Sequence, residues 1–204
     1  MWNNYLPQSV TIHDVAFWVD GFGPADRKNA RAYTFTDTSE GVYIFAGKEI
    51  VFDGVSAQVS LGDIGEDIKS IVMWVNPTNQ TEYLIDLDGS INVNISASTV
   101  TATGWTSPTI YTNDEENPTI AEGVWSLVAV VSDTGIDANA VEIGVISTDF
   151  MTGSMTQIIG FTKALSQVEI NQIWAHGLRP GVSTFLGTEA GDAILQEDGG
   201  FIIV

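Results

Sequence analysis

Residues 71–75 are Ile-Val-Met-Trp-Val, and residues 127–131 are Leu-Val-Ala-Val-Val. Neither run contains a polar side chain, which is the pattern of a central strand buried on both faces. The first run stops at Asn76-Pro77, and the second is followed by the turn-rich segment Asp133–Asn139. Strands of this kind form the middle of a packed pair of sheets, so the two runs predict an all-β protein.

Shorter strand-like runs flank these two on both sides at regular spacing, as in a β-sandwich or barrel. They are predicted at residues 10–20, 32–36, 42–46, 49–53, 55–61, 82–88, 91–95, 98–103, 108–112 and 141–146. The composition agrees, because 20 Val, 21 Ile and 20 Thr stand against 9 Leu, and β-branched side chains suit a pleated surface. A coiled coil, a helical bundle and a disordered acidic tail are excluded.

One helix is predicted at residues 166–176. Ser166 and Glu169 have the spacing of a capping box, in which each side chain binds the other's backbone amide. Gly177 and Pro180 follow the last apolar positions and end the helix.

The charge balance restricts the partners. The chain has 7 basic and 26 acidic residues, a formal net charge of −19. Such a surface repels the phosphates of nucleic acids and the headgroups of anionic membranes, and it favours divalent cations or a basic partner. No nucleic-acid or membrane partner is therefore expected.

Cysteine is absent, so no disulfide places the chain in an oxidising compartment. Residues 1–8 lack the basic and apolar regions of a signal peptide, and the apolar runs are far shorter than the ~20 residues that span a bilayer. These features predict a soluble protein that stays in the compartment that makes it.

Several pieces in order resemble the concanavalin A-like lectin/glucanase superfamily, and specifically its laminin G-like jelly rolls. The matching pieces are Val51-Phe52-Asp53-Gly54 with Val59–Gly62, Ile71–Val75, Gly123-Val124-Trp125 with Leu127–Val131, Val141–Gly144, and Phe161–Ser166 with Glu169-Ile170. The resemblance implies two antiparallel sheets packed as a jelly-roll sandwich, and the helix predicted above adds one short C-terminal helix to this all-β fold. It also implies a concave face or loop rim that binds glycans in some members and only joins proteins in others.

This resemblance divides the chain into three segments. Residues 1–44 form an N-terminal strand or arm that joins the sandwich, residues 45–177 form the laminin G-like jelly roll, and residues 178–204 form an extension. The extension is predicted to end in a β-hairpin with Asp198-Gly199 as its turn. Its sequence, residues 193–204, is similar to the endings of phage virion proteins.

Catalytic residues are not expected. Glucanases of the superfamily carry alternating carboxylates on one strand, and the nearest pattern is Glu82, Asp86 and Asp88, which lacks the required spacing. His13 is predicted within a strand and His176 at the helix end, where a cation suits the helix dipole.

Calcium is the one cofactor that the sequence suggests, because acidic loops supply the oxygen ligands that the ion needs. Asp133, Asp137 and Asn139 are the favoured ligands, and the loop Asn113–Glu116 is the alternative.

Aromatic side chains indicate a glycan site, since flat rings bind the faces of sugars. Trp18, Trp74, Trp125 and Trp174 lie in apolar runs and are assigned to the core. Trp105 lies in a polar turn, and with Tyr111 and Tyr83 it forms the candidate glycan-binding set.

Two functional hypotheses remain open. The first is a non-catalytic structural protein of a phage particle, a capsid decoration or appendage subunit located in the virion. It would bind other virion proteins or copies of itself through residues near its ends: Trp2, Tyr5, Phe201, Ile202 and Ile203. The alternative is a carbohydrate-binding module that recognises a cell-surface glycan through Trp105 and the loop rim.

Overall fold

The computed structural model describes residues 7, 9–10, 12–19, 34–36, 49–176, 186–187, 193–197 and 200–202. Side chains are described for 7, 9–10, 13–19 and 49–175. The predicted strand at 42–46 and the terminal residues Trp2, Tyr5 and Ile203 lie outside these ranges.

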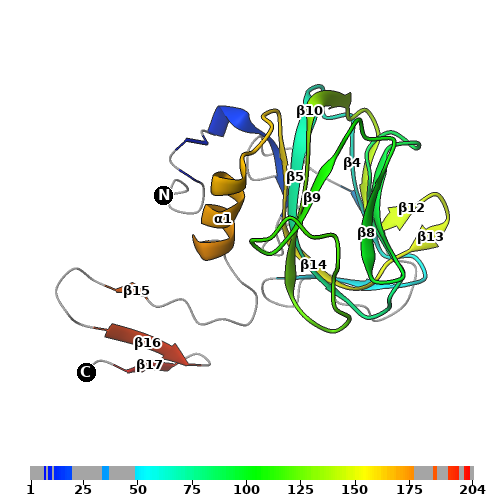
Figure 1. Ribbon diagram of the computed structural model, residues 1–204. Coiled ribbons are helices and arrows are strands. Elements are labelled where there is room, and N and C mark those ends of the chain that lie inside the picture. Colours follow the sequence, from blue (N-terminus) through cyan, green and yellow to red (C-terminus); the bar gives the residue numbers. More distant parts are fainter. Residues whose placement is uncertain are drawn as a thin grey trace.

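Two antiparallel six-stranded sheets make the body of the protein (Figure 1). Sheet 1 has the order β1 (Val15–Val19), β14 (Thr152–Phe161), β5 (Asp67–Pro77), β10 (Ser126–Asp137) and β9 (Thr109–Thr112), with β3 (Ile50–Asp53) also paired to β14. Sheet 2 has the order β2 (Thr34–Thr36), β4 (Gln58–Gly62), β11 (Val141–Ile143), β6 (Glu82–Asp86), β7 (Asn92–Ser96) and β8 (Thr99–Thr103). The predicted two-sheet, all-β class is confirmed.

The main core lies between the two sheets. Both sheets contribute side chains to it: Ile71, Met73, Val75, Val128 and Val130 from sheet 1, and Val59, Leu84, Val93 and Ile143 from sheet 2. A second apolar cluster covers the opposite side of sheet 1, where Val72, Trp74, Leu127 and Ala129 pack with Ile170 and Ile173. Strands β5 and β10 are thus buried on both faces, as their uninterrupted apolar runs predict.

Helix α1 (Gln167–His176) is the only α-helix in the described residues, and it begins with the predicted capping box. The Ser166 amide donates to Glu169 Oε2 at 2.8 Å, and the Glu169 amide donates to Ser166 Oγ at 3.4 Å. Glu169 Oε1 also accepts from Lys163 Nζ at 2.6 Å and from Ser9 Oγ at 2.5 Å. Burial alone would raise the pKa of Glu169, but these donors lower it to about 2. None of the described helices is long and apolar enough to cross a membrane.

Strand β14 is the largest element that the sequence pattern failed to predict. It pairs with β1, β3 and β5. Its glycines and a bulge between Thr156 and Ile159 break the alternation, and Gln157 there has a φ of 49°. Gly160 is required because a Cβ would lie 2.3 Å from the Phe17 ring.

Two further predictions are corrected. His13 lies not in a strand but in a 3-10 turn, Ile12–Asp14, which precedes β1. The predicted turn at Asp133–Asn139 is strand through Asp137, because β10 bulges after Val131 and resumes its pairing with β5 at Ile136.

The remaining strands lie outside the two sheets. A hairpin of β12 (Val145–Ile146) and β13 (Asp149–Phe150) interrupts the chain between β11 and β14. Near the C-terminus, β15 (Leu186–Gly187), β16 (Ala193–Glu197) and β17 (Gly200–Ile202) form a separate three-stranded sheet. Glu197 pairs with Gly200, so β16 and β17 pair as the predicted hairpin requires, while its predicted turn Asp198-Gly199 lies outside the described residues.

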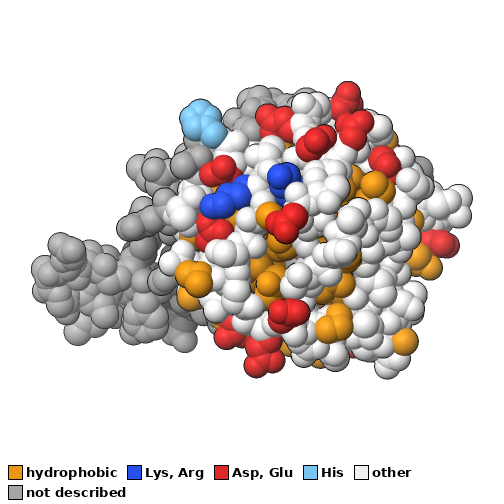
Figure 2. Space-filling model, turned by 45° about the horizontal axis from the view of Figure 1, so that its top comes forward, with side chains coloured by type: hydrophobic (Ala, Val, Ile, Leu, Met, Phe, Trp, Pro, Cys, Tyr) orange, Lys and Arg blue, Asp and Glu red, His pale blue; other side chains and the backbone are white. Residues whose placement is uncertain are grey.

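On the face in Figure 2, acidic side chains are widely spread, whereas the two described basic side chains lie close together. Those are Lys69 on β5 and Lys163 between β14 and α1. The other five Lys and Arg residues lie outside the described side chains.

Candidate functional site

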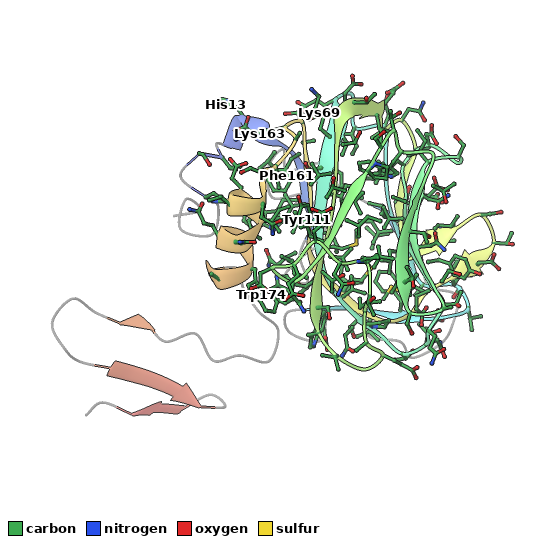
Figure 3. All side chains as sticks on the ribbon, viewed as in Figure 1. His13, Lys69, Tyr111, Phe161, Lys163 and Trp174 are labelled. Atoms are coloured by element: carbon green, nitrogen blue, oxygen red, sulfur yellow. The ribbon has the colours of Figure 1, made fainter. Side chains whose placement is uncertain are left out.

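The outer face of sheet 1 is closed by its own aromatic cluster and α1. Trp74, 2% exposed, stacks on Trp174 of the helix with ring centroids 5.2 Å apart. Figure 3 shows Phe161, Tyr111 and Trp174 lying between the helix and the sheet. These side chains hold α1 in place, so most of this aromatic surface is committed to packing.

The outer face of sheet 2 is polar, and we refer to it as the polar face. Strands β4, β7 and β11 alternate between buried apolar residues and more exposed, mostly polar ones, and β8 does so except at the half-buried Ala102. In β6 the alternation breaks at a register shift, where Leu84 and Ile85 are both buried. The outward side chains are Gln58, Ser60, Tyr83, Asn92, Asn94, Ser96, Thr99, Thr101, Thr103 and Glu142. Hydroxyl and amide groups therefore dominate the described part of this face, which has one aromatic ring and one half-exposed carboxylate.

The strand register orders these side chains into two rows across the sheet. The first row runs Ser60, Glu142, Asp86, Asn92, Thr103, each residue paired with the next. The second row runs Tyr83, Asn94, Thr101. Paired residues on one face lie about 5 Å apart, so each row presents closely spaced hydrogen-bonding groups on a rigid backbone.

Tyr83 lies at the end of the second row, beside the β12–β13 hairpin. The Gly144 amide donates to the carbonyl of Leu84 at 2.8 Å, and the hairpin starts at the next residue, in contact with β6. Figure 1 shows the hairpin projecting from the side of the molecule opposite α1. At the other side of Tyr83, Asn94 Oδ1 accepts from Thr101 Oγ1 at 2.5 Å. Tyr83 is thus next to the residue at which β6 binds the start of the hairpin, and its cross-strand neighbour Asn94 has an amide already bonded to Thr101.

The three predicted glycan-binding aromatics do not form one site. Trp105 is only 7% exposed and belongs to the core between the sheets, because its turn joins β8 to β9 across the sandwich edge. Its Nε1 has no hydrogen-bond partner among the described residues. Tyr111, 8% exposed, belongs to the cluster under α1. Tyr83 alone lies on the polar face.

The four tryptophans assigned to the core divide into two pairs. Trp18 and Trp74 are buried on the outer side of sheet 1, and the Trp18 indole donates to Gln157 Oε1 at 2.8 Å. Trp125 and Trp174 are half-buried and pack against the edge of that cluster.

The predicted calcium ligands Asp133, Asp137 and Asn139 are all exposed, the first two on β10. Within the described part of the chain, no three His, Asp or Glu side chains lie close enough together to hold a metal ion. In the alternative loop, Asn113 Oδ1 accepts from the Leu127 amide and so fixes the loop to β10. Calcium binding stays a prediction.

The carboxylates of the glucanase-like pattern each accept hydrogen bonds from backbone amides. Glu82, 1% exposed, accepts from the amides of Asn79 and Thr152 at 3.0 and 2.7 Å, and burial raises its pKa. Asp86 accepts from the Gly89 amide at 2.7 Å. Partial burial would raise the pKa of Asp88, but hydrogen bonds from Ser90 and Ile91 lower it. These bonds tie loops to strand ends.

Asn92, Asn94, Thr101 and Glu142 were missed as candidate residues. The signal was present, because Asn92-Val93-Asn94-Ile95 alternates strictly and places both amides on the face opposite the core. Of the predicted assembly residues, Phe201 and Ile202 lie on strand β17.

No family model matches the chain, and no curated protein matches its sequence. Solved structures match the fold. Domain 4 of AbnA, an extracellular arabinanase from Geobacillus stearothermophilus in complex with arabinotriose, matches with a TM-score of 0.55 and 15% identity, over 78% of this chain and 98% of that domain.

Two further matches are longer proteins. The Trypanosoma rangeli sialidase with the inhibitor DANA matches with a TM-score of 0.54 and 10% identity, over 78% of this chain and 32% of the sialidase. The receptor-binding domain of a botulinum neurotoxin C/D mosaic matches with a TM-score of 0.54 and 9% identity, over 82% of this chain and 52% of that domain. At these identities the likeness establishes the β-sandwich fold.

Proposed function

We propose that this chain is a non-catalytic carbohydrate-binding module and that its glycan lies on the polar face. The observation that carries the proposal is the half-buried ring of Tyr83 among amide and hydroxyl side chains on rigid strands. An aromatic ring supplies apolar contact, and a few fixed polar groups supply orientation and specificity. The arabinanase domain with bound arabinotriose supports the proposal, because it shares the fold over nearly its whole length.

The two rows suit an oligosaccharide rather than a single sugar. The first row crosses five strands, which lie about 4.8 Å apart, so it offers polar groups over roughly 20 Å. The second row stops at the β12–β13 hairpin. A sugar ring stacked on Tyr83 would therefore have one edge against the hairpin and the other beside Asn94.

The test is binding of the purified chain to an array of oligosaccharides, followed by calorimetry with the best ligand. Tyr83→Ala is expected to weaken binding at least tenfold, because stacking buries a large part of the ring. Asn94→Ala is expected to weaken it by a smaller factor.

Trp125→Ala is the matched control, since it removes a half-buried ring from the sheet 1 side and should leave binding unchanged. Wild-type affinity in a folded Tyr83→Ala protein would show that the glycan does not bind at the polar face.

Attachment of this module to a virus particle is a second proposal. It is supported by the hairpin of β16 and β17, which shares no strand with the sandwich and carries Phe201 and Ile202. In this proposal the hairpin pairs with other virion proteins or with a second copy. Light scattering of the chain with and without residues 195–204 tests it, because an oligomer held by the tail falls to a monomer on truncation.

A further inference from the structure

The charge on the polar face differs from what a receptor for acidic sugars needs. Its described strands carry no Lys or Arg side chain. The two described lysines, Lys69 and Lys163, lie near the start of α1 (Figure 3), on β5 and after β14 respectively. A ligand carboxylate or sulfate on the polar face would meet hydroxyls, amides and a chain of net charge −19.

Glu142 holds the second position of the first row, on strand β11. It pairs with Ser60 on one side and with Asp86 on the other, and its neighbours Val141 and Ile143 are fully buried. Its backbone is therefore fixed by two strands and the core. Among the described residues, no group donates a hydrogen bond to the half-exposed Glu142 carboxylate and no cation pairs with it, whereas Asp86 accepts from loop amides.

A carboxylate in this position treats two classes of glycan differently. It accepts hydrogen bonds from neutral hydroxyl groups, and bonds to an ionised acceptor are stronger than neutral ones. It repels a second carboxylate or a sulfate by an amount that grows as water is displaced from the face.

We propose that the ligand of the polar face is a neutral oligosaccharide and that Glu142 is the residue that excludes uronic, sialic and sulfated sugars. This inference rests on the proposed function. It assigns the hydroxyl-rich, uncharged class of glycan to the site and names one residue that sets this specificity.

The experiment compares trimers of galactose with trimers of galacturonic acid, together with the best neutral ligand from the array and its oxidised, acidic derivative. Each pair differs only in its carboxylates. The neutral member is expected to bind at least tenfold more tightly at low salt. This ratio should shrink in 1 M NaCl, where charges are screened over about 3 Å.

Glu142→Gln should weaken the neutral ligand severalfold and bring the ratio of the two affinities close to one. Glu122→Gln is the control, because it makes the same charge change at an exposed loop position and should leave the ratio as it is. Two results would overturn the inference: acidic glycans that bind as tightly as neutral ones, or equal effects of the two substitutions on the affinity ratio. Neither result would contradict the proposed carbohydrate-binding function. Binding of neither class would overturn the proposed function itself.

Discussion

The two outer faces of the sandwich have the same strand geometry and opposite surface chemistry. On sheet 1, alternate positions carry Trp, Val, Leu and Ala, and α1 covers them. On sheet 2, alternate positions carry Asn, Thr, Ser, Gln and Tyr, and no described helix covers them. Every second residue therefore decides whether a sheet face packs under a helix or stays polar, and four predictions address that difference.

The largest effect is expected from Trp74→Ala on sheet 1. The side chain is buried and stacked on Trp174, so its loss should lower the free energy of unfolding by about 3–5 kcal/mol. Urea denaturation measures this change. Trp125→Ala, which removes a half-buried ring, should have a clearly smaller effect, and equal losses would contradict the assignment of this face to packing.

The second effect concerns how α1 and the N-terminal segment are held to sheet 1. Glu169→Gln should lower stability by about 2 kcal/mol at pH 7, because the wild-type carboxylate has its pKa near 2. A lowered pKa stabilises the fold above the unfolded value of about 4.5, and this gain is lost as the pH falls from 4.5 to 2. Unfolding curves of both proteins should therefore converge over that interval, whereas Glu122→Gln should differ little from wild type throughout.

The third effect tests the connection between the sheets. Glu82 on β6 accepts from the Thr152 amide at the start of β14. Glu82→Gln replaces one accepting oxygen by an NH2 group that faces a backbone N–H. The substitution should lower the free energy of unfolding by about 1–2 kcal/mol. Because the pKa of Glu82 is raised, its ionisation disfavours the folded state, so the advantage of the wild type should decrease as the pH rises above 4.5. If the free energy of unfolding of the wild type exceeded that of Glu82→Gln by more at higher pH, the raised pKa of Glu82 would be contradicted.

The smallest effect is expected on the polar face. Tyr83→Ala should change the free energy of unfolding by only about 0.5 kcal/mol, since an outward side chain on an open sheet contributes little to the core. The thermal midpoint measures it. A loss as large as that of Trp74→Ala would show that Tyr83 is a packing residue and would remove the basis for the glycan proposal.

Much of this fold follows from local patterns in the sequence. Uninterrupted apolar runs identified β5 and β10 because both faces of those strands are covered, and Ser166 with Glu169 identified the start of α1. Strand β14 was missed because Gly153, Gly160 and the Gln157 bulge disrupt the alternation, although each is accommodated by long-range packing against β1 and β5.

The site was harder to predict than the fold. A tryptophan in a polar turn suggests exposure, but Trp105 fills the gap where the chain crosses between sheets, and such a crossing is visible only in three dimensions. Tyr83 lies outside the buried core and stays a candidate, while Asn94 and Glu142 were missed because they come from other segments brought together by strand register.

The β12–β13 hairpin beside Tyr83 has a practical use. Its tip, Ser147-Thr148, is exposed, and the chain contains no cysteine. A Thr148→Cys protein would thus carry one thiol, to which a fluorescent dye could be attached at a single known position. Such a dye, held at the edge of the polar face, would report occupancy of that face directly as a change in its emission.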